Sequence, residues 1–555
     1  MAETQSNHTV DPNNGFCKKT RTFHSLRPPV PLPPPTQPLS MSDYALSLLR
    51  STLTSPPETT AVLIHSTTGR RLFYSDFIRQ TQILSSSLQN LVPSLSSGQV
   101  AFILSPPSLE LPVLYFSLLS LGVTISPSNP LASESEIAHQ IRLSKPVIAF
   151  ATSSTAHKLP SLPLGTVLLD SPQFHSMMTT PRGNNYNSSR VKVNQSDSAA
   201  ILYSSGTTGR VKGVALTHLN FIALIAGFYY NKSEEDENAP HPVSLFTLPL
   251  FHVFGFFMLI RAVAMGETLV LMEKFDFEEM LRAVEKYKVN YMPVSPPLVV
   301  AMAKSELTSK YDLSSLQMLG SGGAPLGKEV SESFSARFPN IEIVQGYGLT
   351  ESTGGVTRML GPDESKRHGS VGRLADNMEA KIVDPATGEA LAPEQRGELW
   401  LRGPTIMKGY VGDDEATSET LDSEGWLKTG DLCYFDSDGC LYIVDRLKEL
   451  IKYKAYQVPP AELEHLLQSN PEIADAAVIP YPDEVAGQIP MAYVVRKPGS
   501  SITGAQVMDY IAKQVAPYKK IRRIAFVNSI PKSPAGKILR RELVNHALSG
   551  VSSKL

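Results

Sequence analysis

The chain has 555 residues, so several domain-sized units and a large core fit within it. Hydrophobic residues make up 42% and charged residues 19%, which is ordinary for a globular protein and excludes a disordered or fibrous class. The net charge of −2 excludes a strongly basic surface for nucleic acid or an anionic membrane. Three cysteines, Cys17, Cys433 and Cys440, are too few for a disulfide framework, so we expect structural thiols in a reducing compartment.

The ends of the chain and its apolar runs predict where the protein resides. The runs at residues 111–125 and 251–260 are shorter than a bilayer span, so we expect buried core and no transmembrane segment. The first residues lack the apolar stretch of a secretory signal. The last three residues, 553–555, read S-K-L, the tripeptide that the peroxisomal import receptor binds. The sequence therefore predicts a peroxisomal protein with that receptor as a partner.

Proline dominates the segment before the first periodic pattern. Residues 27–38 read RPPVPLPPPTQP, which favours extended polyproline II backbone. We expect residues 1–40 to form an extended arm that leads into the first domain; a ligand for an SH3-type module is the alternative.

From about residue 41 to 440, helical patterns alternate with short β-branched runs. Residues 196–206 (SDSAAILYSSG) predict a buried strand that ends in a glycine loop, and residues 276–289 predict an amphipathic helix. Residues 290–303 predict a strand and a turn, and residues 341–351 (IEIVQGYGLTE) a strand followed by a glycine turn. This alternation indicates an α/β fold with largely parallel sheets, in which ligands bind at the carboxyl ends of strands.

The pattern changes toward the C-terminus. Residues 396–445 contain short strands typical of a small β-rich part, and a charged junction follows at 446–448. We therefore predict a large N-terminal domain over residues 41–446 and a small α+β domain over residues 447–552. Lysines on both sides of the junction favour a mobile lid over a passive linker.

The stretch SSGTTGRVKGV, residues 204–214, has the composition of a phosphate-binding loop. It is no Walker loop, because Val211 stands where glycine precedes the lysine and Gly213 follows Lys212 in place of Ser or Thr. It is no dinucleotide fingerprint either. Its glycines, hydroxyls and Lys212 nevertheless suit a polyphosphate; a flexible surface loop is the alternative.

Six further segments stand in a fixed order with this loop: LPLFHVFGF with His252, GSGGAPLGKE from residue 320, QGYGLTEST from residue 345, WLKTGDLC with Asp431, VDRLKELIKYKAYQ from residue 444, and PKSPAGKILRREL with Lys537. As an ordered set they resemble the adenylate-forming acyl-CoA synthetases, and within them the plant 4-coumarate:CoA ligase-like proteins. The resemblance runs from about residue 40 to the end. The S-K-L tail and GGAPLGKEV are similar to the peroxisomal branch linked to fatty acids and jasmonate precursors.

The resemblance implies ATP, CoA and Mg²⁺ as cofactors and assigns nucleotide-binding roles. The β- and γ-phosphates of ATP are expected at Ser204, Ser205, Gly206, Thr207, Thr208 and Lys212. Adenine and the α-phosphate are expected at Gln345, Gly346, Tyr347 and Thr350. Asp431 is expected to bind the ribose hydroxyls with support from Arg446, Glu351 to bind Mg²⁺, and Lys537 to contact the α-phosphate and the acid.

The same resemblance assigns the remaining polar residues, each with a plainer alternative. His252 is expected to gate the acyl site, although a core histidine is the alternative. Lys452 with Gln457 is expected near the adenylate, and Lys448 at the hinge. The CoA path is expected along Lys274, Lys454 and Ala455. For Lys448, Lys452 and Lys454, a solvated lysine face is the alternative. Two positions depart from the family pattern: Val211 replaces proline, and Ala455 replaces the glycine beside the pantetheine route.

By alignment with the coumarate enzymes, the acyl pocket is expected at Phe254, Met258, Gly320, Gly323, Gly348 and Gly355. The glycines leave room and the first two residues offer an apolar wall. The pattern therefore favours a medium or long fatty acid, or a jasmonate precursor such as 12-oxo-phytodienoic acid. A hydroxycinnamate is the alternative acid; a luciferase-like oxidase and a carrier-protein ligase are alternatives in other classes.

Overall fold

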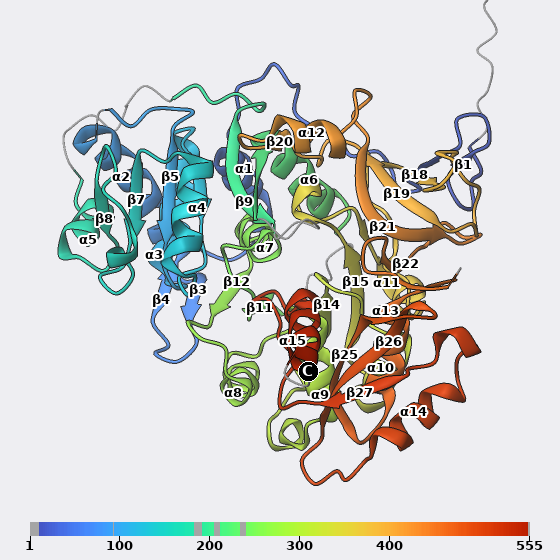
Figure 1. The fold of residues 1–555 in the computed structure, drawn as a ribbon. Helices are drawn as coiled ribbons and strands as arrows, with labels where there is room; N and C mark the ends of the chain where they lie inside the picture. The colour runs from blue at the N-terminus through green and yellow to red at the C-terminus, as the bar shows by residue number, and fades with distance from the viewer. Residues whose placement is uncertain are drawn as a thin grey trace, which may run out of the picture.

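The computed structural model describes residues 10–92, 94–181, 191–204, 211–232, 240–454 and 456–552. Within these residues the chain forms four β-sheets with helices packed on their faces (Figure 1). The predicted α/β class with largely parallel sheets is confirmed.

The largest sheet has nine strands and is parallel from β15 to β3, with antiparallel strands at both edges. In spatial order its strands are β17 (Arg373–Leu374), β16 (Thr357–Arg358), β15 (Glu342–Tyr347), β14 (Met318–Ser321), β13 (Tyr291–Val294), β11 (Val243–Phe246), β12 (Thr268–Leu271), β3 (Ala61–His65) and β4 (Arg71–Phe73).

A second sheet of seven strands is parallel except at the edge formed by β10 and β20. Its order is β20 (Gly409–Tyr410), β10 (Lys212–Thr217), β9 (Ser198–Ser204), β6 (Thr124–Pro127), β5 (Val100–Leu104), β7 (Ile148–Ala151) and β8 (Thr166–Leu168).

The third sheet is antiparallel and has six strands in the order β1 (Phe16–Cys17), β2 (Thr22–His24), β18 (Glu379–Val383), β19 (Gly397–Arg402), β21 (Leu427–Phe435) and β22 (Leu441–Arg446). The fourth sheet lies in the C-terminal unit, with the order β24 (Tyr456–Val458), β23 (Ile451–Tyr453), β26 (Gly487–Arg496) and β25 (Ile473–Asp483), and with β27 (Arg523–Phe526) paired to β26. The change of sheet falls between Arg446 and Ile451, the interval that contains the predicted domain boundary.

The helices of the large domain are α1 (Met41–Thr52), α2 (Tyr74–Leu91), α3 (Glu110–Ser120), α4 (Glu134–Ser144), α5 (Pro172–Thr179), α6 (His218–Tyr230), α7 (Val253–Ala264), α8 (Phe277–Tyr287), α9 (Pro296–Lys304), α10 (Lys328–Arg337), α11 (Gly361–Ser365) and α12 (Asp414–Thr420). The C-terminal unit carries α13 (Pro460–Ser469), α14 (Gly504–Ala512) and α15 (Arg540–Ser552). Short 3₁₀ segments are η1 (Ala156–Lys158), η2 (Glu306–Lys310), η3 (Thr350–Ser352) and η4 (Pro517–Lys519).

Local sequence signals explain most of these elements. The predicted strand before the glycine loop is β9, and the predicted amphipathic helix is α8, whose N-cap Asp276 accepts a hydrogen bond from the Glu279 amide. The predicted turn after β13 is instead the start of α9. Pro296 and Pro297 occupy the first turn of that helix, where their missing N–H groups cost nothing.

The two apolar runs lie in the core, as predicted. They fall largely within α3 and α7, whose side chains are almost entirely buried, and α7 packs against α1 and α6. In the part of the chain that the structure describes, no helix is long and apolar enough to cross a bilayer. The three cysteines are buried free thiols.

The N-terminal segment differs from the extended arm predicted for residues 1–40. Residues 16–24 form the hairpin β1–β2, and β2 pairs with β18. Phe23 is completely buried and stacks on Phe435 of the third sheet at 4.4 Å between ring centroids. This apolar contact holds the hairpin on the third sheet. The proline-rich stretch that follows the hairpin has no regular secondary structure as far as α1.

Candidate active site

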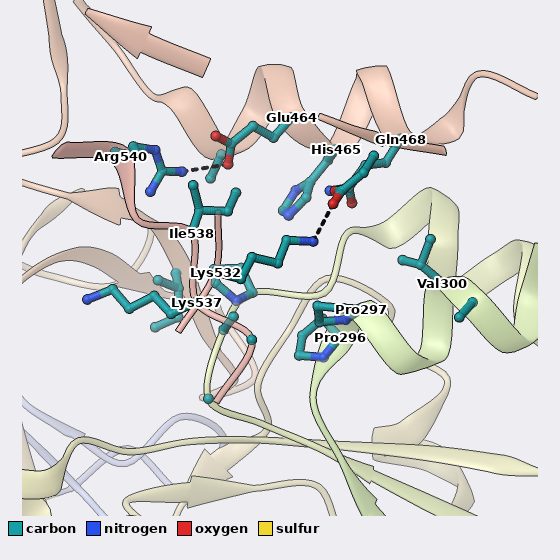
Figure 2. Close-up of a pocket in the computed structure, with 18 of the residues that line it drawn as sticks. Pro296, Pro297, Val300, Glu464, His465, Gln468, Lys532, Lys537, Ile538 and Arg540 are labelled. Carbon is teal, nitrogen blue, oxygen red and sulfur yellow. Dashed lines mark hydrogen bonds and ion pairs between the residues drawn. The ribbon is translucent and has the colours of Figure 1, made fainter. Parts of the chain in front are cut away.

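A cavity of about 690 Å³ lies between the large domain and the C-terminal unit. Its walls come from the ends of β15, β21 and β22, from α9 and α13, and from the loop before α15. Figure 2 shows Lys537 and Arg540 on one side of the cavity and Val300 on the other. The predicted residues Gly323, Gly346, Tyr347, Gly348, Asp431, Arg446 and Lys537 all line it.

Asp431 is the central carboxylate of the cavity. It is 3% exposed, and β21 places it directly opposite Arg446 on β22. The Tyr347 hydroxyl donates to its Oδ2 at 2.6 Å, and the Arg446 guanidinium lies 3.4 Å from Oδ1. Burial raises the pKa of Asp431, and Arg446 opposes that shift. Residues from two different sheets therefore orient one carboxylate toward the cavity.

Lys537 reaches the same cavity from the C-terminal unit. Its pKa is lowered to about 8, chiefly by burial and then by Arg446, while Glu449 and Asp431 oppose the shift. The preceding residue, Gly536, has a φ of +83°, and a Cβ there would lie 2.9 Å from the Ser295 hydroxyl of the large domain. This glycine therefore lets the loop that carries Lys537 approach the start of α9.

His252 is the N-cap of α7, and its Nδ1 accepts a hydrogen bond from the Phe254 amide at 3.3 Å. Burial lowers its pKa to about 4, and Lys537 adds to this shift. The imidazole is therefore neutral near neutral pH. His252 is not among the residues that line the cavity, so its role as a gate stays a prediction.

The phosphate loop is described only at its two ends. Ser204 ends β9 and Lys212 begins β10, whereas Ser205, Gly206, Thr207 and Thr208 lie outside the described residues. The Lys212 ammonium lies 4.4 Å above the ring of Tyr410.

Tyr410 connects the loop lysine to the predicted metal ligand. Its hydroxyl donates to Glu351 Oε1 at 3.0 Å, and both side chains are buried. Thr350 is buried beside Glu351 on η3, and Gln345 is buried on β15. Sequence reasoning missed Tyr410, because it reaches the site only through the pairing of β20 with β10.

No group of three or more His, Cys, Asp or Glu side chains that could hold a metal ion occurs among the described residues. Mg²⁺ that accompanies a nucleotide needs only one or two carboxylates besides phosphate oxygens. Glu351 fits that requirement, because only its Oε1 is engaged by Tyr410.

The predicted acyl side is walled by aromatic rings. Phe254 stacks on Phe257 at 5.6 Å, and Phe257 on Phe228 at 6.1 Å, while Met258 is buried in the adjacent core. Arg358 lies 4.7 Å from the Phe228 ring and pairs with Asp376.

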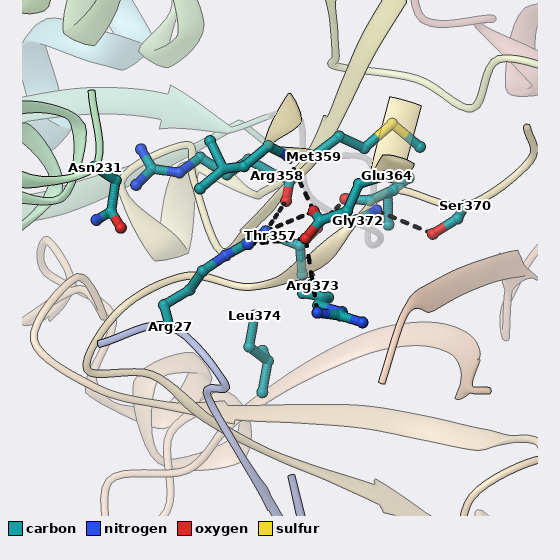
Figure 3. Close-up of polar contacts among 12 residues, drawn as sticks. Arg27, Asn231, Thr357, Arg358, Met359, Glu364, Ser370, Gly372, Arg373 and Leu374 are labelled. Carbon is teal, nitrogen blue, oxygen red and sulfur yellow. Dashed lines mark hydrogen bonds and ion pairs between the residues drawn. The ribbon is translucent and has the colours of Figure 1, made fainter. Parts of the chain in front are cut away.

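The arginines near this wall already have acidic partners. Arg261 pairs with Glu267 at 2.8 Å. Figure 3 shows Arg358 beside Arg27, which is paired with Glu364 at 2.6 Å and donates to the Arg358 carbonyl. These three arginines are therefore already engaged by carboxylates of the protein.

The four predicted acyl glycines have different surroundings. A Cβ on Gly348 would lie 2.3 Å from the backbone oxygen of Gly354, so this position needs glycine for backbone packing. Gly323 has a φ of +85°. A Cβ on Gly320 would meet the Tyr291 hydroxyl at 2.5 Å, and one on Gly355 would meet only the Leu224 side chain at 2.8 Å. Only the last two positions have side chains as their nearest neighbours.

The residues predicted for the later chemistry do not line the cavity. Lys452 and Gln457 face each other across the β23–β24 hairpin and are exposed, as are Lys454 and Lys274. Lys448 lies between β22 and β23, and Ala455 lies outside the described residues. The structure thus brings Lys537 to the cavity and leaves the other two functional lysines of the C-terminal unit outside it.

Sequence and structure comparisons agree with this geometry. The family model for AMP-binding enzymes matches residues 49–411, and the model for the AMP-binding enzyme C-terminal domain matches residues 462–537. The chain therefore belongs to the AMP-binding enzyme family.

Two similar proteins show which group of the AMP-binding enzyme family the chain belongs to. The chain is 59% identical to 4-coumarate--CoA ligase-like 9 of Arabidopsis thaliana, over 100% of both chains. It is 45% identical to peroxisomal OPC-8:0-CoA ligase 1 of the same plant, over 99% of this chain and 100% of the relative. It is thus a plant 4-coumarate--CoA ligase-like protein, an AMP-forming acid–CoA ligase.

Solved structures share the fold. o-Succinylbenzoate CoA synthetase from Bacillus subtilis, in complex with its acyl-adenylate intermediate, is 25% identical with a TM-score of 0.75, over 90% of this chain and 97% of that one. ATP-bound MatB from Rhodopseudomonas palustris is 24% identical with a TM-score of 0.80, over 92% of this chain and 99% of that one. The second likeness concerns the fold alone.

The lowered pKa of Lys537 predicts the pH dependence of adenylate formation. The lysine is charged below its pKa of about 8 and neutral above it, so kcat/KM for this half-reaction should fall as pH rises through about 8. The measurement is a pH profile of acid-dependent exchange of pyrophosphate into ATP. A profile that stays flat well above this pH would contradict the assignment of a charged Lys537.

Proposed function

We propose that the protein activates a bulky, largely apolar monocarboxylic acid, of the fatty acid or jasmonate-precursor type, and transfers it to CoA in two steps. In the first step a carboxylate oxygen bonds to the α-phosphorus of ATP, and the bond to pyrophosphate breaks. In the second step the CoA sulfur bonds to the acyl carbon, the bond to AMP breaks, and the thiol proton is lost. ATP and CoA are substrates here, and Mg²⁺ would bind at Glu351 and neutralise phosphate charge.

One observation supports the two-step course above all others. The cavity contains Lys537 and not Lys452, Lys454 or Gln457, which lie exposed on a hairpin of the same C-terminal unit. We propose that residues 447–552 form a mobile lid hinged at Lys448. One orientation presents Lys537 for adenylation, and another presents Lys452 and Gln457 to the adenylate and Lys454, with Lys274 and Ala455, to CoA.

Three residues that line the cavity, Lys537, Arg446 and Asp431, support their proposed roles. Lys537 and Arg446 both line the cavity, so two cations would face the phosphate and the carboxylate there. Tyr347 fixes the Asp431 carboxylate, which would accept hydrogen bonds from the ribose hydroxyls. His252 is neutral near neutral pH, so it would gate the acyl side without charge repulsion toward Lys537. Ser204 to Thr208 with Lys212 would hold the terminal phosphates.

The acid class is supported by the apolar wall and by a named relative. Phe254, Phe257 and Phe228 form an aromatic surface, and the nearby arginines have acidic partners. One relative is named for OPC-8:0 and for the peroxisome. A substrate panel tests the proposal: CoA-dependent AMP release should be fastest with stearic acid or 12-oxo-phytodienoic acid, and a clear preference for coumarate would overturn it.

Replacing Lys537 with alanine tests the two orientations. Loss of a charge contact at a developing anion should reduce adenylate formation about 10²- to 10³-fold, because the first step brings two anions together beside Lys537. Thioester formation from supplied acyl-adenylate and CoA should be unaffected. An equal loss in both half-reactions would refute the two orientations.

Replacing Gly355 tests the size of the acyl pocket. Gly355 has no positive φ, and its nearest neighbour is the flexible end of Leu224, so alanine adds little strain. Gly355→Val should reduce kcat/KM for stearic acid roughly ten- to a hundred-fold and leave cinnamate nearly unchanged. Gly355→Ala is the matched control. A uniform fall for both acids in both variants would mean that the glycine serves the backbone.

We further propose that Ser553-Lys554-Leu555 directs the protein to the peroxisome. These residues lie outside the described part of the chain, so the proposal rests on the S-K-L sequence and on the peroxisomal relative. Deletion of the three residues should move a fluorescently tagged protein from peroxisomes to the cytosol and leave ligase activity intact. Persistent import would point to another signal.

A further inference from the structure

The helix α13 of the C-terminal unit is contacted at both ends by charged side chains of the large domain. At its start, Asp445 at the end of β22 accepts a hydrogen bond from the Ala461 amide at 2.9 Å. At its end, Lys304 of α9 donates to the Gln468 carbonyl at 2.7 Å. An acid at the start of a helix and a cation at its end both complement the helix dipole.

Lys304 makes a second contact beyond the helix. Its ammonium also donates to the carbonyl of Ile473, the first residue of β25, at 2.7 Å. Carbonyls in the last turn of a helix lack intrahelical partners, so this lysine satisfies groups that α13 cannot satisfy by itself. Burial lowers its pKa to about 8, with a further contribution from Lys497, while Asp475 opposes the shift. The ammonium is thus charged near neutral pH.

Between these two ends, α13 lies directly on the large domain. His465 of α13 packs on Gly327, the N-cap of α10. A Cβ on Gly327 would lie 2.8 Å from His465 Cγ, which is too close for any side chain at this position. A glycine on one domain therefore permits close approach of a helix on the other, and Figure 1 shows α13 and α10 side by side.

The docked helix is tied to the catalytic lysine by an ion-pair network. Glu464 of α13 pairs with Arg540 at 2.5 Å, as Figure 2 shows, and Arg540 also pairs with Glu449 near the junction. Arg540 follows Lys537 by three residues and lines the same cavity. A shift of α13 on the large domain would therefore displace the loop that carries Lys537.

We propose that Lys304 is a positioning residue that holds the C-terminal unit, through α13, in the orientation that presents Lys537 for adenylation. Gly327 is the second part of this interdomain contact, since it allows His465 to approach. The Lys304 hydrogen bonds must break when the unit turns to a second orientation. The role assigned to Lys304 thus rests on the two orientations of the proposed function.

The first experiment separates the two half-reactions. Lys304→Met keeps the aliphatic stem and removes the charge, so two carbonyls lose a charged donor. We expect adenylate formation to fall roughly ten- to a hundred-fold, with thioester formation from supplied acyl-adenylate unchanged or faster. Lys304→Arg should restore part of the loss. The matched control is Lys310→Met, a nearby exposed lysine of the same domain, which should behave like the wild type.

Gly327→Ala tests the same contact without altering charge. It should also reduce adenylate formation selectively, because its methyl group separates α10 from His465. Thermal unfolding of each variant identifies any general loss of stability. A parallel fall in both half-reactions of Lys304→Met, or no change in either, would overturn the proposal.

A second measurement does not depend on catalysis. Fluorophores on cysteines introduced at Leu131 and Val485, which are 87% and 83% exposed on the large domain and the C-terminal unit, report the distance between them. Lys304→Met should shift or broaden the distribution of energy transfer relative to the unsubstituted labelled enzyme and to Lys310→Met. An unchanged distribution would refute the positioning role, even if the wild type activated none of the acids tested.

Discussion

The active site depends on a buried carboxylate. Asp431 is almost inaccessible to solvent, and an isolated charge there would be costly. The site therefore has to supply partners: Tyr347 from the end of a parallel strand, Arg446 from the neighbouring antiparallel strand, and the positive field of Lys537 from the C-terminal unit. Compensation of this one charge brings together residues from two sheets of the large domain and from the C-terminal unit, and the cavity lies where they meet.

The charges around the cavity suit a reaction between two anions, a phosphate and a carboxylate. Burial and, after it, the nearby Arg446 both disfavour the charge of Lys537. Phosphate and carboxylate groups that enter the site would offset the positive charges of Arg446 and Lys537. The repulsion between these two cations therefore favours the binding of anions. Burial, with a smaller contribution from Lys537, keeps His252 neutral near neutral pH.

Polar contacts cross the interface between the C-terminal unit and the large domain. The core of the C-terminal unit, formed by residues such as Ile451 and Leu463, is separate from the cores of the large domain. Across the interface lie the Asp445–Ala461 and Lys304–Gln468 hydrogen bonds and the close packing of His465 on Gly327. Contacts of this kind fix an orientation and can be exchanged for others, whereas a large apolar interface would resist opening.

Much of the site was predictable from sequence because its motifs are local. The strand that ends at Ser204 and the strand and turn around Gly346 and Tyr347 follow from patterns within about ten residues. Tertiary structure decided what pairs at long range: Tyr410 between Lys212 and Glu351, Phe23 on Phe435, and Lys304 on the end of α13. It also separated Gly348, which is required by backbone packing, from Gly355, which faces a side chain. By itself the sequence determined which residues could carry the chemistry, since residue type and local spacing specify turns, strands and charges. Only the fold decided which of them meet, because contacts between residues hundreds of positions apart depend on sheet order and domain orientation, which no local pattern encodes.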